Sequence, residues 1–133
     1  SFKYFKKKSI NKKVKIKDFL MNQSFVSGLG NIYVNEILFL CKIKPNRKLH
    51  KLNDQEIKDI IINTKKVLKK AIIYGGSSIK NFSSGLGKKG NFQQQFNVYG
   101  KNKYKCSNSD CNGIVKKIVI SNRASFYCSK CQK

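Results

Sequence analysis

Acidic residues are scarce in this 133-residue chain, which has 6 Asp and Glu against 29 Lys and Arg and a formal net charge of +23. The acids are scattered, so the sequence offers no pair of carboxylates placed for general acid–base catalysis. The single histidine, His50, has no cysteine or acid at ligand spacing, and we expect it at the surface rather than in a metal site or a Ser/His/Asp triad. Because the sequence shows no recognisable set of catalytic residues, we first infer function from its net charge.

The excess of positive charge favours a polyanionic partner. A net charge of this size disfavours self-compaction and attracts DNA or RNA. A plainer interpretation is a lysine-biased composition from an AT-rich genome, because asparagine and isoleucine are abundant as well. The two interpretations are compatible, and nucleic acid is the partner that we expect.

Long apolar runs are also missing. The lysine-rich start has no apolar core of a secretory signal, and no stretch approaches the length that spans a bilayer. Five cysteines, an odd number, fit reduced thiols with one metal site better than a disulfide framework. We therefore expect an intracellular monomer without membrane association, in the cytoplasm or nucleoid of a bacterium or in an organelle. The odd cysteine, Cys41, lies on the apolar face of a predicted helix and is expected in the core.

Four cysteines in two pairs form the strongest motif of the chain. Sixteen residues separate the pairs, enough for a hairpin that returns the second pair to the first. We expect a hairpin through 114–127 that turns at 121–122, and one structural Zn²⁺ that orders a segment too short to bury its own core. Spacing alone leaves an iron–sulfur cluster open, although a closed site on a β-branched hairpin favours zinc. The predicted ligands are Cys106, Cys111, Cys128 and Cys131.

Apolar periodicity predicts helices in the first part of the chain. The first covers about 16–23, and the second runs from Asn31 to about residue 42, because Pro45 cannot continue it. Residues 1–15 show little periodicity and are expected to be a lysine-rich lead-in.

A third helix carries the clearest local signal. Asn53 and Glu56 form a capping box before it, and the glycines at 75–76 end it. The predicted fold class is therefore mainly α with a small β zinc ribbon. The expected domains are a helical domain at 1–82, a connecting segment at 83–100 and a zinc finger at 101–133.

Two further features suit phosphate binding. Gly28 and Gly30 precede Asn31 at a helix start, where backbone N–H groups point outward, although a plain glycine turn with an N-cap explains this pattern equally well. Arg123 lies just past the predicted hairpin turn, and the only other arginine, Arg47, is expected at the surface. Sparing use of arginine suggests a position where lysine cannot serve, such as a bidentate grip on a phosphate.

Three segments together resemble one family, the formamidopyrimidine-DNA glycosylases. Residues 19–36 (FLMNQSFVSGLGNIYVNE) resemble the helix–two-turn–helix of these enzymes, and residues 87–100 (GKKGNFQQQFNVYG) resemble their lesion loop with the segment that follows it. Residues 123–132 (RASFYCSKCQ) resemble the end of their zinc finger. The match covers nearly the whole chain in the right order.

The resemblance implies a base-excision-repair enzyme that removes oxidised purines such as 8-oxoguanine from double-stranded DNA and then cleaves the abasic strand by β,δ-elimination. It implies that Asn31, beside Gly30, and Arg123 grip phosphates around the lesion, and that Lys17 matches a lysine used near the lesion. The implied lesion loop, which closes over an everted base, contains Gly85, Gly87, Lys88, Lys89, Gly90 and Asn91.

The chain departs from the family pattern in two ways. The family's nucleophile is an amino-terminal proline followed by a catalytic glutamate, whereas this chain begins Ser1-Phe2-Lys3. We therefore assign no catalytic residue and expect the DNA-binding half of the enzyme, which binds damaged duplex without cutting it. The second departure is the four residues, where the family usually has two, between Cys106 and Cys111, which we expect to reshape the knuckle without loss of zinc.

Two alternatives stay open. A non-enzymatic zinc-ribbon module would grip the nucleic-acid backbone without lesion preference, but it would not need a glycine-rich loop at 83–91. The other alternative is the branch of the same family that acts on oxidised pyrimidines. The run at 88–93 favours the purine branch.

Overall fold

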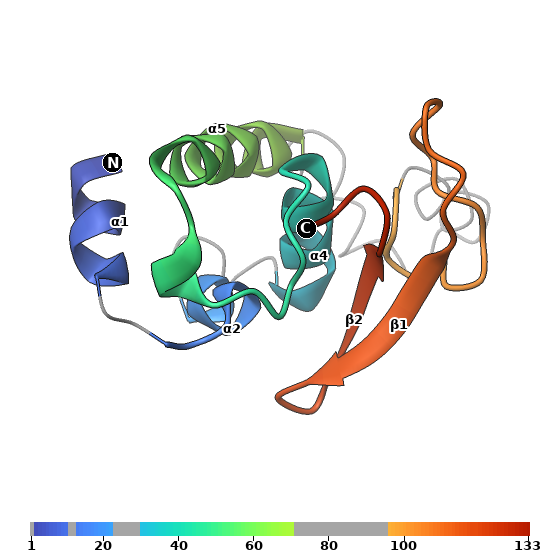
Figure 1. Ribbon diagram of the computed structural model, residues 1–133, viewed down its shortest axis with the longest axis horizontal. Coiled ribbons are helices and arrows are strands. Elements are labelled where there is room, and N and C mark those ends of the chain that lie inside the picture. Colours follow the sequence, from blue (N-terminus) through green and yellow to red (C-terminus); the bar gives the residue numbers. More distant parts are fainter. Residues whose placement is uncertain (1, 11–12, 23–29, 71–95) are drawn as a thin grey trace, which may run out of the picture.

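The computed structural model describes residues 2–10, 13–22, 30–70 and 96–133 (Figure 1). Within them, helices are followed by a two-stranded antiparallel hairpin, so the predicted fold class is confirmed. None of the described helices is long and apolar enough to cross a membrane. The elements are α1 (Phe2–Ser9), α2 (Ile16–Met21), α4 (Gly30–Leu40), the 3₁₀ helix η1 (Leu49–Lys51), α5 (Asp54–Lys70), β1 (Val115–Ile120) and β2 (Arg123–Cys128).

Several predicted features lie outside the described residues. They are the turn residue Gly28, the end of the third helix at 75–76, and the expected lesion loop with Gly85, Gly87, Lys88, Lys89, Gly90 and Asn91.

The three predicted helices are present and begin close to where their sequence signals place them. Helix α5 starts with the expected capping box, in which Asn53 Oδ1 accepts from the backbone N–H of Glu56 at 2.7 Å. Glu56 Oε1 in turn accepts from the backbone N–H of Asn53 at 3.0 Å. Two N–H groups that a helix start leaves unpaired are thereby satisfied, which explains why this boundary was readable from sequence.

Helix α1 was missed, because the lead-in expected at 1–15 is helical from Phe2 to Ser9. Its apolar face consists of Phe2 and Phe5, three residues apart, and a run of lysines obscured this short pattern. Phe5 is buried against Phe19 of α2, with ring centroids 5.1 Å apart. Tertiary packing, rather than local periodicity, therefore stabilises α1.

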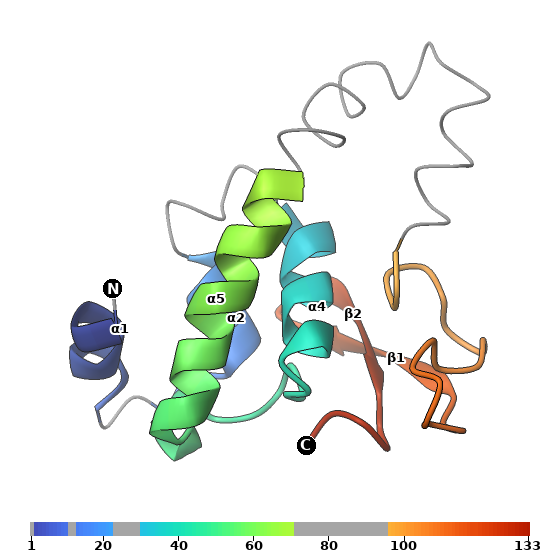
Figure 2. The same cartoon turned by 90° about the horizontal axis from the view of Figure 1, so that it is seen from above.

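Helix α4 is the centre of the molecule. Figure 2 shows it between α5 and the hairpin, and it also packs against α2. Seven consecutive residues from Tyr33 to Phe39 are buried, so the helix has no solvent-facing stripe over this stretch. Because α4 contacts both the helical core and the ribbon, it fixes the position of one relative to the other.

The hairpin has the predicted register and turn. Strand β1 pairs with β2 from Val115 opposite Cys128 to Ile120 opposite Arg123. Ser121 and Asn122 both have positive φ, at 50° and 65°, which is the conformation of a type I′ turn. This turn matches the right-handed twist of the strands and places Arg123 at the tip of the ribbon.

The outer edge of β2 is paired with side chains instead of a third strand. Asn35 Oδ1 on α4 accepts from the backbone N–H of Phe126 at 2.7 Å, and Gln132 Oε1 accepts from that of Cys128 at 2.8 Å. Gln132 is fully buried and also donates to the carbonyl of Ile43 at 2.8 Å. The ribbon is thus attached to the helical part at the middle of β2 and at the end that carries Cys128.

Glu36 of α4 connects the helical part to the segment that leads into the ribbon. Its carboxylate is buried and accepts from the consecutive backbone N–H groups of Asn97, Val98 and Tyr99 at 2.7, 2.9 and 2.9 Å. A hydrogen bond that a charged carboxylate accepts is stronger than a hydrogen bond between two neutral groups. Among the described contacts, these three bonds are what replaces the water that the carboxylate loses on burial. Glu36 therefore determines the path of the chain where it enters the ribbon.

Arg47 is not the plain surface residue that the sequence suggested. Its guanidinium forms a bidentate pair with Glu56, at 2.5 and 2.8 Å, and donates to the carbonyls of Lys51 and Lys133 at 3.1 Å each. The planar fork of arginine can satisfy these acceptors together, whereas the ammonium of lysine cannot match that geometry. This explains one of the two arginines of the chain.

We predict that Glu36→Ala lowers the free energy of unfolding by about 3 kcal/mol, because one buried and two partly buried N–H groups lose their acceptor. Urea unfolding of the metal-loaded protein measures this. Asp110→Ala, which removes an exposed acid, is the control and should change stability by less than about 0.5 kcal/mol. Equal stability of the two variants would contradict the assigned role of Glu36.

Candidate metal centre and nucleic-acid interface

The four paired cysteines meet at the end of the ribbon opposite its tip. Their Sγ atoms all lie within 4.8 Å of one another, with Cys106 and Cys131 3.5 Å apart and Cys111 and Cys128 3.6 Å apart. A tetrahedral Zn²⁺ with Zn–S bonds of about 2.3 Å requires sulfur atoms about 3.8 Å apart. The sulfur positions therefore fit a closed four-thiolate site.

The surroundings of the sulfurs also fit a metal. The backbone N–H of Gly113 points to Cys111 Sγ at 3.3 Å, and the side-chain amide of Asn108 points to Cys131 Sγ at 3.4 Å. Such donors stabilise thiolates and orient them toward a cation. A Cβ on Gly113 would lie 2.7 Å from Cys128 Sγ, so only glycine fits against the cluster.

The wide knuckle between Cys106 and Cys111 is compatible with this geometry. Its four intervening residues include Asn108, whose carbonyl accepts from the N–H of Cys111 at 3.0 Å and whose side chain reaches Cys131. The four Sγ atoms lie together despite the longer loop, while retention of zinc by this knuckle stays a prediction.

Cys41 is separate from the cluster, as expected. It is buried in the helical core, where burial raises the pKa of its thiol to about 12, and Asn63 donates to its sulfur at 3.6 Å. Burial outweighs the opposing effect of the Asn63 hydrogen bond on the pKa and keeps the thiol protonated, so the residue serves packing. His50 is exposed at the surface, also as expected.

A second cluster gathers at the tip of the ribbon. Arg123 is exposed at the start of β2, and beside it opens a pocket of about 260 Å³. The pocket is lined by α2 and the residue that follows it on one side and by the hairpin on the other. Its lining residues are Lys17, Asp18, Met21, Asn22, Ile120, Ser121 and Arg123.

Asn31 and Lys17, both singled out from sequence, converge on the residue after Arg123. Asn31 Nδ2 donates to the carbonyl of Ala124 at 2.8 Å, and Lys17 Nζ donates to the same carbonyl at 3.1 Å. Lys17 also donates to Ser125 Oγ at 2.5 Å. The structure thus brings three predicted binding residues together, from α2, α4 and β2.

Lys17 is unusual because a charged lysine is almost entirely buried, with 1 % of its surface exposed. Burial lowers the pKa of its amine to about 8; the Asp18 carboxylate opposes this shift, and the Arg123 guanidinium adds to it. Near neutral pH the amine is largely charged, and its two acceptors compensate part of its lost hydration.

Gly30 starts α4 with φ of 69°, a left-handed conformation that side chains rarely adopt. No neighbouring atom would contact a Cβ there, so the backbone conformation and not crowding accounts for glycine. Asn31 follows immediately, and its side chain reaches the carbonyl of Ala124 beside Arg123.

Sequence reasoning missed the residues that join the two parts, Asn35, Glu36 and Gln132. Asn35 and Glu36 stand within an otherwise apolar helix, and such isolated polar residues in a buried stretch are the signal that could have identified them. Gln132 follows the last cysteine and carries no comparable signal.

We predict that Cys128→Ser releases the metal and unfolds the ribbon while the helices persist, since their apolar cores form separate clusters. Metal analysis for zinc and iron, together with far-ultraviolet circular dichroism, measures both effects. Cys41→Ala is the matched control and should retain one equivalent of metal. A full equivalent of metal in the Cys128→Ser protein would refute the four-cysteine site.

Comparison of the sequence with known proteins shows which family has this arrangement. Residues 1–83 match the model of the formamidopyrimidine-DNA glycosylase H2TH domain. The formamidopyrimidine-DNA glycosylase of Rickettsia bellii (strain OSU 85-389) is 46 % identical over 130 residues, which are 98 % of this chain and 47 % of that protein. The enzyme of Roseobacter denitrificans is 43 % identical over 123 residues, 92 % of this chain and 44 % of that protein. The chain thus spans about half the length of these relatives.

Solved structures give the same result. A complex of Lactococcus lactis Fpg with DNA that contains an abasic site superposes with a TM-score of 0.85 at 39 % identity, over the whole chain and 48 % of that protein. A complex of MutM with DNA that contains carbocyclic 8-oxo-G gives a TM-score of 0.84 at 38 % identity, over the whole chain and 47 % of that protein. This chain therefore belongs to the formamidopyrimidine-DNA glycosylase family and comprises its DNA-binding helical domain and cysteine-bearing ribbon.

Proposed function

We propose that this chain is the DNA-binding half of a base-excision-repair glycosylase and abasic-site lyase that acts on oxidised purines such as 8-oxoguanine. The observation that carries the proposal is the convergence of Lys17, Asn31 and Arg123 at the ribbon tip from three separate elements. In this proposal Arg123 and Asn31 grip phosphates on either side of a flipped nucleotide, beside Gly30, and the expected loop at 84–91 closes over the base.

The chemistry of these groups supports phosphate binding. Arg123 is exposed, and its guanidinium can donate two parallel hydrogen bonds to one phosphate. The side-chain amide of Asn31 has two hydrogens, of which one goes to Ala124, so the other is available to a second phosphate oxygen. Backbone N–H groups at the start of α4 add partial positive charge at the same place.

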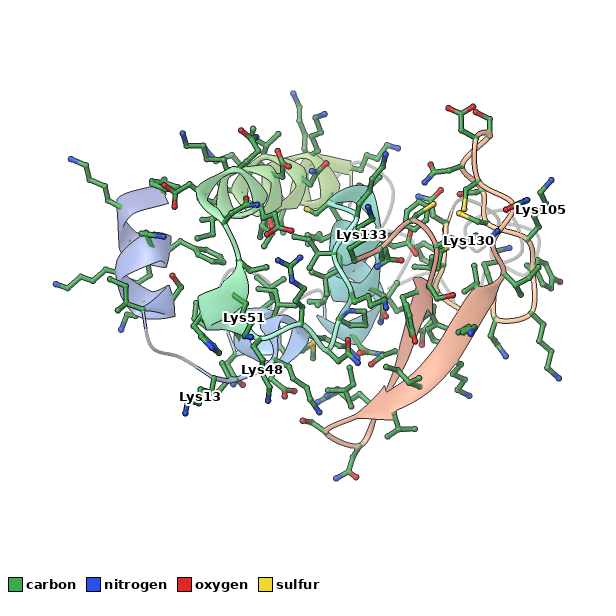
Figure 3. All side chains as sticks on the ribbon, in the orientation of Figure 1. Lys13, Lys48, Lys51, Lys105, Lys130 and Lys133 are labelled. Atoms are coloured by element: carbon green, nitrogen blue, oxygen red, sulfur yellow. The ribbon has the colours of Figure 1, made fainter. Side chains whose placement is uncertain are left out.

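The lysines supply attraction over a wider surface. Lys13, Lys48 and Lys51 lie together near the 3₁₀ helix, while Lys105 and Lys130 lie on the ribbon away from its tip, as Figure 3 shows. All five are exposed. Such spread charge steers DNA toward the protein and adds salt-dependent affinity without selecting a lesion. Lesion selectivity is therefore assigned to the cluster at the tip.

We assign the metal as one structural Zn²⁺ held by Cys106, Cys111, Cys128 and Cys131. It supplies no chemistry to the reaction. It closes the base of the hairpin, and without it the ribbon could not hold Arg123 against α2 and α4.

We further propose that these 133 residues bind without cutting. The single proline of this sequence, Pro45, has its nitrogen in a peptide bond, so it has no free secondary amine of the kind that the family uses as nucleophile. Oxidised purines are favoured over pyrimidines as substrates of the whole enzyme by the run at 88–93.

We predict that Arg123→Ala weakens binding to a duplex with a stable abasic-site analogue by about 10- to 100-fold, the range expected for loss of a charge-assisted bidentate contact. Binding to the undamaged duplex should fall much less. Fluorescence anisotropy at one fixed physiological salt concentration measures both affinities. Lys105→Ala removes the same charge from the far end of the ribbon and should weaken binding to both duplexes equally. If Arg123→Ala also weakens both equally, the chain is a module that binds the DNA backbone without lesion preference.

The proposal that the chain does not cut DNA is tested by borohydride trapping. Incubation with abasic-site duplex and borohydride should give no covalent complex and no strand cleavage, because this sequence does not begin with the proline and glutamate that the family uses for catalysis. A full-length relative serves as the positive control. A trapped complex would overturn this part and show that an amine of this chain, on a lysine or at Ser1, acts as the nucleophile.

A further inference from the structure

The amine of Lys17 is bonded to the ribbon. It lies behind the first residues of β2, where it donates to the carbonyl of Ala124 and to the hydroxyl of Ser125. Ser125 Oγ in turn donates to the carbonyl of Arg123 at 3.3 Å. One side chain of α2 is therefore connected to the backbone of Arg123 through one intermediate hydroxyl.

The resemblance to the family suggests a different role for Lys17, that of a group used near the lesion. A lysine that meets a substrate needs a free and accessible amine, whereas this side chain is 1 % exposed and has two protein acceptors. Ser125, its closest acceptor, is completely buried. Lys17 contributes to the wall of the pocket beside Arg123, but its amine is engaged by the two acceptors of β2.

We propose that Lys17 is a positioning residue for Arg123, acting on DNA through the hydrogen-bonded chain from its amine to Ser125 and the Arg123 backbone and not by touching DNA. The proposal rests on the function proposed above, in which Arg123 grips a phosphate at the lesion.

The geometry at the edge of β2 explains why such a residue is needed. Within the described residues, β2 has only β1 as a neighbouring strand, and on its other edge the carbonyl of Ala124 meets side chains of the helices. Lys17 and Asn31 approach the carbonyl of Ala124 from α2 and α4 and thereby fix β2 from two directions. An arginine that must meet a phosphate in a bidentate manner gains from such a fixed backbone, because less freedom is lost on binding.

The charge of Lys17 couples this support to the bound anion. The groups that face its amine are the carboxylate of Asp18 on α2, the guanidinium of Arg123 on β2 and the neutral amide of Asn31 on α4. A phosphate held by Arg123 favours the charged amine, so the complex binds more protons than the free protein from about pH 8 upward. Affinity should then fall as pH rises through this range.

A double-mutant cycle separates positioning from direct contact. In the unmutated background, Lys17→Met should weaken binding to the abasic-site duplex about tenfold, and in the Arg123→Ala background less than about twofold, because the residue that it positions is already missing. Lys13→Met, which removes an exposed lysine of the same segment, is the control and should cost the same small factor in both backgrounds. A tenfold loss in both backgrounds would show that Lys17 contacts DNA itself and would overturn the proposal.

Ser125→Ala provides a second test that does not alter charge. Since Ser125 is fully buried, it cannot touch DNA, yet its loss breaks the connection to Arg123 and should weaken binding about threefold. Both variants are first compared with the unmutated protein by thermal unfolding and metal content. A folded, metal-loaded Ser125→Ala protein with unchanged affinity would refute the relay.

The pH dependence completes the test. Between pH 7 and 9.5, the affinity of the unmutated protein should fall more steeply than that of Lys17→Met, whereas a merely structural role leaves the two profiles parallel. The double-mutant cycle can be repeated with undamaged duplex. It then measures the coupling free energy between Lys17 and Arg123 even if the chain binds damaged and undamaged DNA equally well. Failure of lesion preference and failure of the positioning role are thus separate results.

Discussion

The position of the ribbon depends on how the open edge of β2 is satisfied. A two-stranded sheet leaves one edge of each strand without a partner, and here the edge of β2 turns toward the helices, where water is excluded. Alternate residues along that edge are capped by side chains: the carbonyl of Ala124 by Lys17 and Asn31, the N–H of Phe126 by Asn35, and the N–H of Cys128 by Gln132. These bonds orient the tip and the metal end together.

The metal site and the side chains that bind the open edge of β2 fix different parts of the ribbon. The four cysteines close the base of the hairpin, while α2 and α4 hold its tip, and neither constraint alone would place Arg123. In a chain with a net charge of +23, the junction uses the amides of Asn31, Asn35 and Gln132 and the buried carboxylate of Glu36, with Lys17 as a buried cation beside them. Neutral and acidic groups can enter a dry interface without adding repulsion to an already basic protein, which leaves most lysines at the surface for attraction to DNA.

Local signals account for what could be predicted. The capping box of Asn53 and Glu56 and the turn at Ser121 and Asn122 are decided within a few residues, so sequence located both. Helix α1 was missed because its two phenylalanines gain their stability from α2 and α5, which the local pattern does not contain. Arg47 was assigned to the surface for the same reason, since Glu56 and Lys133 become its neighbours only after folding.

The sequence by itself determined three of the helices, the hairpin and the four clustered cysteines, because spacing and turn chemistry are local properties. It pointed to Asn31 and Arg123 mainly through the family resemblance. Only the tertiary structure decided how these parts act on one another. It turned Lys17 inward to the carbonyl of Ala124 and brought Glu36 against residues 97–99, which lie about sixty positions away in the chain. Which acceptor a buried polar group meets depends on the packing of distant segments, and no periodicity in one segment records it.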